Sequence, residues 1–476
     1  MIEALAQNIT VWDAIQRFGR VLEPYMPVFY VSFVATLILT PMMRMLAHRH
    51  GIVDDPDNKR KVHTQPIAYL GGVSIFLGWL AGVSISVFLR PHNADQIFTT
   101  NVQIPPGVLL GAAVVVLFGL MDDVYSLSPK IKLAGQFLAG IVLVGPGFVG
   151  IGQDYFLGGH VARAANGSMQ FVSSDRGIGF MLINYPKNLQ WIDLPDAGSP
   201  AMMYLTLGLV AVSALGAVFI IIATCNATNL LDGLDGLCSG VTGVMSLGYL
   251  LLAVFLALNV RVAGSDGGSP IDPTRITLSL ALLGAVMGFL PFNFNPASIF
   301  MGDTGSMFLG YICGVMILLF GQSGITIKWV LAAIIIFGLP MLDTFLAIVR
   351  RKLNGKPIFS PDSNHFHHFL IKRGFTVKKA VLISYGIAAV FVSFALMIVV
   401  TPTRLAIGIY FVLFGWIIVA AFKMGMIFQQ KPVVANTTIN ATILGQTPVV
   451  GTPVITGPVT PTVVNVDQPA GPSQPV

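Results

Sequence analysis

Charged residues are scarce in this chain. Lys, Arg, Asp and Glu make up 10% of its 476 residues, whereas a typical soluble domain has about 25%. Apolar residues make up 54%, and the mean hydropathy is +0.78. Both values argue against a set of soluble domains. Apolar runs of 18 or more residues recur from Met26 to Gly425, and each could cross a hydrocarbon layer roughly 30 Å thick. We therefore predict an all-α fold, a polytopic bundle of transmembrane helices.

Cysteine is rare as well, and no pair has the spacing of a redox or zinc motif. Cys225, Cys238 and Cys313 lie in or beside apolar runs, so we interpret them as small packing residues. Residues 1–25 lack the basic start and short apolar core of a cleavable signal peptide. Their apolar residues instead recur every three or four positions, which predicts an amphipathic helix on the membrane surface. The residues in question are Leu5, Ile9, Trp12, Ile15 and Phe18.

The apolar runs predict about eleven membrane spans, on the criterion of roughly 20 residues for each. The transmembrane domain extends over 26–430, with a hydrophilic insert at 151–200 that is too polar to span. A tail over 431–476, rich in Pro, Thr and Val, is predicted to be disordered. The expected spans are 26–47, 67–89, 105–121, 131–150, 201–225, 234–258, 276–293, 305–325, 328–349, 380–400 and 404–424.

Eleven spans would place alternate loops on one face of the membrane. That face holds 17 of the 27 Lys and Arg residues, so the positive-inside rule makes it cytoplasmic and puts the N-terminus outside. The net charge of +6 then reflects orientation and anionic lipid rather than nucleic acid. The same face gathers six of the eight histidines and most aspartates of the apolar region. Ionisable groups at the edges of apolar helices are costly and mark functional sites by default.

Four polar stretches on this face carry the functional argument. In GLMDDVYSLSPKIKLAGQ (119–136), Asp122 and Asp123 end one span, and Lys130 and Lys132 begin the next. Paired carboxylates can make a base or share a divalent cation, and lysines can hold phosphate. In NATNLLDGLDGLCSG (226–240), the spacing of three predicts a helical stripe of oxygen donors. That stripe comprises Asn226, Asn229, Asp232 and Asp235, and it fits Mg²⁺ or a sugar. In PFNFNPASIFMGDTGSMFLG (291–310), Gly302 and Gly305 permit a tight turn that presents Asp303 at a helix start, where N–H groups and Ser306 favour anions.

A fourth stretch, SPDSNHFHHFLIKRG (360–374), crowds His365, His367 and His368 beside Lys372 and Arg373. Closely spaced histidines can bind zinc, but no cysteine and no HExxH helix accompany these histidines. Phosphate binding is the better interpretation.

Together and in this order, the four stretches resemble the polyprenyl-phosphate N-acetylhexosamine-1-phosphate transferases, which are glycosyltransferases of family 4. The resemblance extends from about Met26 to Gly425. A fifth stretch, KRKVHTQPIAYLGG (59–72) with Lys61, and the His-Phe-His-His pattern resemble the branch that uses UDP-N-acetylglucosamine. The muramoyl-pentapeptide branch is expected to have a tighter run of three histidines and a TPTMGG-like stretch, and this chain has neither.

This resemblance implies transfer of N-acetylglucosamine-1-phosphate from UDP-N-acetylglucosamine to undecaprenyl phosphate with release of UMP. The location implied is a bacterial inner membrane with a cytoplasmic active site, and the role is lipid-linked cell-envelope glycan synthesis. The catalytic residues implied are Asp122, Asp123, Asp232, Asp235 and Asp303. Asp303 and Asn229 would hold Mg²⁺, with Mn²⁺ as an alternative, and Asp122 or Asp123 would deprotonate or align the lipid phosphate. Asp232 and Asp235 would shape the nucleotide-sugar site. The other substrate-binding residues implied are Lys61, Lys132, Asn226, Asn229, His365, His367 and His368.

Several alternatives stay open at this stage. The chain could be a phospho-N-acetylmuramoyl-pentapeptide transferase or could use another UDP-N-acetylhexosamine, and a homodimer is neither required nor excluded. A transporter would use buried aspartates near the bilayer midplane and internal repeats. Here the aspartates lie at one edge, and no repeat is visible. Asp343 in the ninth span also matches the family pattern, without a role that the sequence reveals.

Overall fold

The computed structural model describes residues 11–54, 66–88, 102, 104–144, 159–163, 169–173, 200–259, 272–321, 327–355, 357 and 365–423. All of them belong to the unit Met1–Gln429. The tail 431–476, Lys61, Leu5 and Ile9 lie outside the described residues, and so does most of the insert 151–200.

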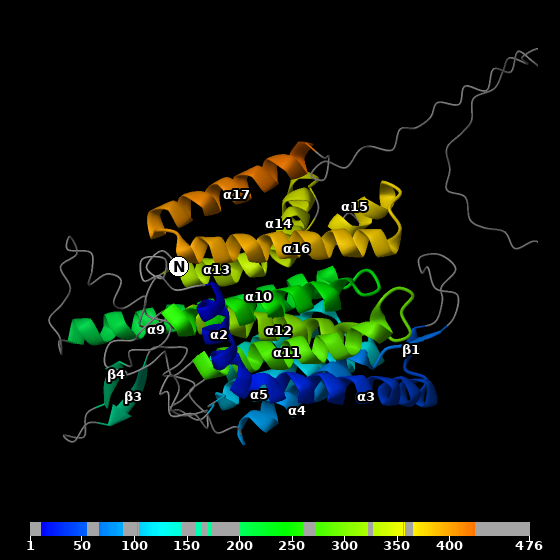
Figure 1. Ribbon diagram of the computed structural model, residues 1–476, viewed down its shortest axis with the longest axis horizontal. Coiled ribbons are helices and arrows are strands. Elements are labelled where there is room, and N and C mark those ends of the chain that lie inside the picture. Colours follow the sequence, from blue (N-terminus) through cyan, green and yellow to red (C-terminus); the bar gives the residue numbers. More distant parts are fainter. Residues whose placement is uncertain are drawn as a thin grey trace, which may run out of the picture. The chain divides into compact units, whose positions relative to one another are not determined.

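Helices make up most of the described chain (Figure 1), so the all-α prediction is confirmed. The first is α2 (Val11–Leu22), where an amphipathic helix was expected; it is followed by the short 3₁₀ helix η1 (Glu23–Tyr25). The remaining helices are α3 (Met26–His50), α4 (Gly71–Ser86), α5 (Pro106–Tyr125), α6 (Pro129–Val144), α9 (Pro200–Leu231), α10 (Leu237–Asn259), α11 (Asp272–Asn293), α12 (Gly302–Gly321), α13 (Ile327–Ile336), α14 (Gly338–Leu353), α15 (Phe366–Lys372), α16 (Val377–Val400) and α17 (Thr403–Lys423).

Seven helices of the described residues are long and apolar enough to cross a membrane, which confirms a polytopic membrane protein. They are α10, α11, α12, α16, α5, the later part of α9, and the stretch Ile15–His50 that contains α3. An eighth candidate is the bent pair Lys328–Ile336 and Gly338–Leu353, whose halves meet at 76°. The expected span at 328–349 therefore contains a sharp bend, and α4 and the apolar part of α17 are shorter than the criterion.

Two small antiparallel ribbons accompany the helices. Strand β1 (Val53–Asp54) pairs with β2 (Ile67–Ala68), with Val53 opposite Ala68. Ala68 also forms a bridge to Ile299, and this bridge joins the β2 segment to the loop before α12. In the insert, β3 (Gly159–Arg163) pairs with β4 (Met169–Ser173).

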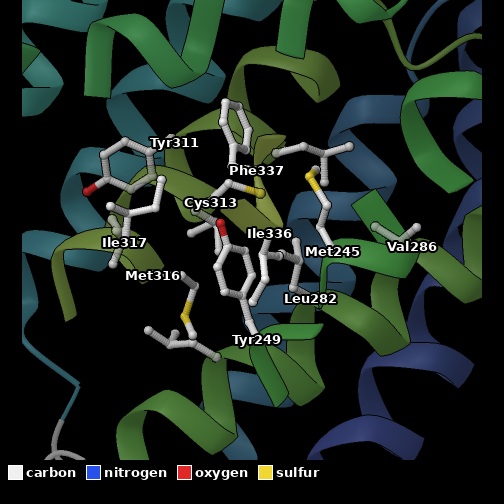
Figure 2. Close-up of a cluster of buried hydrophobic side chains, with 14 of the residues drawn as sticks. Met245, Tyr249, Leu282, Val286, Tyr311, Cys313, Met316, Ile317, Ile336 and Phe337 are labelled. Atoms are coloured by element: carbon white, nitrogen blue, oxygen red, sulfur yellow. The ribbon is translucent and has the colours of Figure 1, made fainter. Parts of the chain in front are cut away.

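Helix α12 forms the centre of the bundle. Every residue in it except Asp303 is buried, as expected for a helix that is apolar on all sides. It contacts α9, α5, α4 and α13, while α11 packs between α3 and α10, and α16 packs on α10 and α13 (Figure 1). Figure 2 shows part of this core, where side chains of α10 to α13 meet: Met245, Tyr249, Leu282, Val286, Tyr311, Cys313, Met316, Ile317 and Ile336.

A buried ion pair lies inside the bundle, at the end of α12 away from Asp303. The guanidinium of Arg275 is fully buried, bonds the Asp272 carboxylate at 2.5 Å, and donates to the Leu319 carbonyl at the end of α12. An unpaired charge at this depth would cost several kcal/mol. The bond from Arg275 to Leu319 therefore joins α11 to one end of α12. The polar site lies at the other end of α12. The three cysteines are buried, as expected for packing residues.

Candidate active site

One end of α12 is surrounded by every described polar stretch that the sequence singles out. The end of α5, the start of α6, the end of α9 and the segment before α12 all converge there. Lys132 of α6 makes the central contact: its ammonium lies 2.6 Å from Asp122 Oδ2 and 2.5 Å from Asp303 Oδ2. Lys132 and Asp303, which are 171 positions apart in the chain, are thus in direct contact. Asp122 also accepts a hydrogen bond from the Leu127 amide at 2.7 Å, which fixes the turn between α5 and α6.

Asp123 has a different role from its neighbour. Its carboxylate accepts from the amides of Asp303 and Thr304 at 2.7 and 3.1 Å, and from the Thr304 hydroxyl at 2.5 Å. These are free donors of the first turn of α12, so a carboxylate from another helix caps it. Gly302 has φ of +65°, and a Cβ there would lie 2.4 Å from Asp123 Oδ2. The expected anion-binding helix start is therefore occupied by Asp123, which fixes Asp303. Ser306 lies fully buried in the second turn.

The expected helical stripe of Asn226, Asn229, Asp232 and Asp235 is wrong in one respect. Helix α9 continues to Leu231 and carries the two asparagines, but Asp232–Gly236 forms a turn before α10 begins. The turn ends at Gly236, which has φ of +79°, a backbone conformation that L side chains rarely adopt. Asp235 Oδ2 accepts from the Asn295 side chain at 2.9 Å and from the Ala297 amide at 3.0 Å. The turn is thereby attached to the loop that leads into α12.

The two asparagines at the end of α9 face different partners. Asn226 donates to Gln136 Oε1 of α6 at 2.6 Å and to the Ile222 carbonyl. Asn229 forms a side-chain hydrogen bond with Asp303. The structure thus brings Asn229 and Asp303 together, as the sequence analysis expected for a metal pair, and places Asn226 at the edge.

A pocket of about 260 Å³ opens beside these groups. Its lining combines polar residues with the aromatic rings of Tyr69 and Phe300, whose centroids lie 5.9 Å apart. Its lining comprises Tyr69, Asn229, Asp232, Gly233, Leu234, Asp235, Asn293, Phe300, Gly302 and Asp303. Such a pocket suits a ligand with a planar or apolar part and a polar part.

Charge is concentrated around this pocket. Burial is the main cause that raises the pKa of Asp232 from 3.8 to about 8, and the nearby carboxylate of Asp303 adds to the shift. The site therefore has an excess of negative charge that a cation or a proton has to balance.

The histidine stretch lies against the same turn. A Cβ on Gly233 would be 2.3 Å from Nε2 of His367, so this ring reaches the turn through the space that glycine leaves. In the part of the chain that the structure describes, neither ring nitrogen of His367 has a hydrogen-bond partner, and the residue is 1% exposed. Burial lowers the pKa of His367 from 6.5 to about 3, which makes the ring neutral near pH 7.

The structure also shows what Asp343 contacts. From the buried face of α14, its carboxylate lies 2.9 Å from Nδ1 of His365 and accepts from the Phe366 amide at 2.8 Å. It therefore anchors the start of α15, and with it the two histidines that follow. The ring of His368 lies beside that of His367, with centroids 4.3 Å apart and the ring planes tilted by 49°.

The donor set fits a divalent cation. Carboxylate oxygens of Asp122, Asp123 and Asp303 lie within 4.8 Å of one another, and hard oxygen ligands are those that Mg²⁺ prefers. The amide of Asn229 adjoins this group. Because Asp123 already caps α12, the residues that could hold the ion are Asp303, Asn229 and Asp122.

Sequence reasoning missed several residues of the site. Asn293 accepts from the Gly236 amide and the Ser239 hydroxyl and donates to the Ile299 carbonyl, so it joins the turn to the loop before α12. Asn293 lies in the stretch PFNFNP, ten residues before Asp303. This spacing did not place the two residues on one face of a helix, so Asn293 was not predicted. Tyr69 lies in the stretch KRKVHTQPIAYLGG and was overlooked because its neighbours are apolar.

Comparison with known proteins adds independent support. The family model described as glycosyl transferase family 4 matches residues 105–321. The chain is 32% identical over 405 residues to the "Probable undecaprenyl-phosphate N-acetylglucosaminyl 1-phosphate transferase" of Bacillus subtilis, covering 85% of this chain and 93% of that protein. It is 30% identical over 363 residues to the "Decaprenyl-phosphate N-acetylglucosaminephosphotransferase" of Mycobacterium tuberculosis, covering 74% and 77%. It is also 25% identical to the "Undecaprenyl-phosphate alpha-N-acetylglucosaminyl 1-phosphate transferase" of Escherichia coli K12, covering 84% and 92%.

Proposed function

Because the chain belongs to glycosyl transferase family 4, we propose that it transfers N-acetylglucosamine-1-phosphate from UDP-N-acetylglucosamine to undecaprenyl phosphate and releases UMP. The observation that carries the proposal is the pocket beside the cluster formed by Asp122, Lys132 and Asp303. The pocket offers aromatic rings for a nucleotide, and the cluster adjoins apolar helices along which a lipid can arrive. The relatives carry names for this type of reaction.

The chemistry is an exchange of one phosphoanhydride for another. An oxygen of the lipid phosphate attacks the β-phosphorus, which bears the sugar, and the bond from this phosphorus to the oxygen bridging to the α-phosphate breaks. UMP leaves with that oxygen, and the sugar phosphate remains on the lipid as a diphosphate. Because a bond of the same type is broken and formed, the reaction is close to neutral in free energy and reversible.

The charges of the site favour an aligning role for Asp122. A phosphate monoester loses its second proton at a pKa of roughly 6, so the lipid phosphate is largely ionised near pH 7 and needs little help from a base. Asp122 is 8% exposed and bonded to Lys132. It holds the ammonium in place, and the ammonium attracts the phosphates. Asp123 acts one step further away by fixing Asp303.

The metal belongs to the proposal as well. Asp303, Asn229 and Asp122 would hold Mg²⁺, which when bound supplies positive charge to the diphosphate and stabilises the departing UMP. Asp232 and Asp235 would shape the nucleotide-sugar side, together with His367. Lys61 and His368 are proposed to steady phosphates, and His365 is proposed to support them through its bond to Asp343.

The membrane arrangement follows the same logic. We propose about eleven spans in a bacterial inner membrane, with the end of α12 that carries Asp303 at the cytoplasmic face. UDP-sugars are cytoplasmic metabolites, and the basic residues at the ends of α14 to α16 favour that side.

The test is a reaction of the purified protein in lipid nanodiscs with undecaprenyl phosphate and a panel of UDP-sugars. UDP-N-acetylglucosamine should release UMP and give a lipid-linked diphosphate sugar by mass spectrometry, and added UMP should reverse the reaction. The panel includes UDP-N-acetylgalactosamine and UDP-N-acetylmuramoyl-pentapeptide, and Asp303→Asn serves as the inactive control. Release of UMP only from the muramoyl-pentapeptide would move the chain to that branch. No release from any UDP-sugar by folded protein would refute the proposal.

A further inference from the structure

The last residue of the turn Asp232–Gly236 is held from three helices. Its amide donates to Asn293 Oδ1 of α11 at 3.2 Å. Its carbonyl accepts from the hydroxyl of Tyr385 of α16 at 2.5 Å, and also from the Gly240 amide of α10 at 3.0 Å and the Ser239 hydroxyl at 3.4 Å. The peptide groups on both sides of the Gly236 Cα are thereby fixed at the point where the chain adopts φ of +79°.

The Tyr385 ring reaches this carbonyl through a space that another glycine leaves. A Cβ on Gly240 would lie 1.9 Å from both Cζ and the hydroxyl oxygen of Tyr385. Real carbon atoms do not approach so closely, so any other residue at position 240 would displace the ring. The contact therefore depends on two residues 145 positions apart in the chain.

Tyrosine hydroxyls bonded to backbone carbonyls occur elsewhere in the bundle. Tyr249 donates to the Ala333 carbonyl at 3.3 Å, and Tyr311 donates to the Gly107 carbonyl at 3.1 Å. Those acceptors lie within helical segments of the core. The acceptor of Tyr385 belongs to the turn whose Asp232 and Asp235 line the pocket.

Helix α15 contacts the same turn at Gly233 through His367, and α16 follows α15 after a connection of four residues. Two consecutive helices therefore contact the turn, α15 at Gly233 and α16 at Gly236. Asp235 is in turn bonded to the loop before α12. A shift of Gly236 would move both aspartates relative to Asp303.

We propose that Tyr385 is a positioning residue for the nucleotide-sugar pocket: its hydroxyl holds the Gly236 carbonyl and so sets the places of Asp232 and Asp235. The role rests on the proposed function, because it assumes that this pocket binds the UDP-sugar. Tyr385 itself does not line the pocket.

Tyr385→Phe tests the role, since it keeps the ring in the space beside Gly240 and removes only the hydroxyl. The loss of one hydrogen bond of this kind changes an equilibrium constant by about 3- to 10-fold. We expect the KM for UDP-N-acetylglucosamine to rise about 3- to 10-fold, while the KM for undecaprenyl phosphate and the thermal midpoint stay close to those of the wild type. Gly240→Ala, which displaces the ring, should raise the same KM. Tyr249→Phe is the matched control, because it removes an equivalent bond away from the turn and should change neither KM.

The outcomes separate the two proposals. If the wild type releases UMP and Tyr385→Phe has both KM values unchanged, or changed in step with Tyr249→Phe, the positioning role is overturned and the proposed function stands. If the wild type releases no UMP from UDP-N-acetylglucosamine, the proposed function fails, and the role of Tyr385 fails with it.

Discussion

Lys132→Met offers a sharp test of the charge cluster, because methionine has a similar length and no charge. The ammonium lies 2.6 and 2.5 Å from two carboxylates. At an effective dielectric constant of about 20, each such pair would gain about 6 kcal/mol. The lysine side chain is 29% exposed and that of Asp303 is 26% exposed, so water screens the pairs and reduces the net value to about 1–3 kcal/mol.

Removing the lysine leaves three carboxylates whose oxygens lie within 4.8 Å of one another. At the same effective dielectric constant of about 20, two carboxylates at that distance repel by about 3.5 kcal/mol. The cluster should relieve this repulsion by binding a cation more tightly. A gain of about 1.4 kcal/mol is tenfold in affinity, so we expect Lys132→Met to bind Mn²⁺ about tenfold more tightly than the wild type in the absence of substrate.

Turnover should nevertheless fall by at least about 100-fold, because the positive charge that attracts phosphate is lost. Electron paramagnetic resonance of Mn²⁺ titrations would measure the affinity, and UMP release would measure turnover. Lys130→Met is the matched control, since Lys130 is the neighbouring exposed lysine of α6. The reasoning is refuted if Mn²⁺ affinity falls together with turnover in Lys132→Met, because the lysine would then support the cation site rather than compete with it.

Three further outcomes are expected. Asp303→Asn should lower turnover about 10²–10³-fold with folding intact, whereas Asn229→Ala should lose less and regain part of its activity at higher Mg²⁺; near-normal turnover of Asp303→Asn would refute the metal assignment. The pKa of His367 lies near 3 in the folded protein and near 6.5 when unfolded. Between these pH values only the unfolded chain binds a proton on this ring, so the free energy of unfolding should fall as pH drops below about 6.5. Denaturant unfolding at pH 7 and 5 should show a loss of about 1–2 kcal/mol in the wild type that His367→Gln largely lacks, and equal losses would contradict a buried neutral ring. Cysteines introduced at Ser128 and Asp175 should be labelled from the cytoplasm and from outside respectively, against a low background because the native cysteines are buried; labelling of both from one side would contradict the proposed topology.

Much of the site could be predicted from the sequence because polar residues in an apolar chain are conspicuous. Carboxylates at the ends of apolar helices are costly to bury alone, so they are expected to gather in a shared polar site. The scarcity of charge determined the fold class, and the spacing of the four stretches indicated the family. Asp303, Asn229, Asp122 and Lys132 were each named from these stretches, and the structure places them together.

The different roles of neighbouring residues could not be predicted from the sequence. Asp122 and Asp123 are adjacent and chemically identical, yet one pairs with Lys132 and the other caps α12. The direction of each side chain follows from how α5 packs on α12, and a spacing of one residue on a helix says only that the two point about 100° apart. The predicted helical stripe was wrong at Asp232 because α9 ends at Leu231, and the spacing of three alone does not show where a helix ends.

The long-range contacts were decided by tertiary structure alone. Asp343 of α14 bonds His365 at the start of α15, and Tyr385 reaches Gly236 only because Gly240 lacks a side chain. Hydropathy and spacing constrain what lies on one helix, because they follow from local geometry. Which helices face each other depends on how their surfaces fit, and that is a property of the packed bundle.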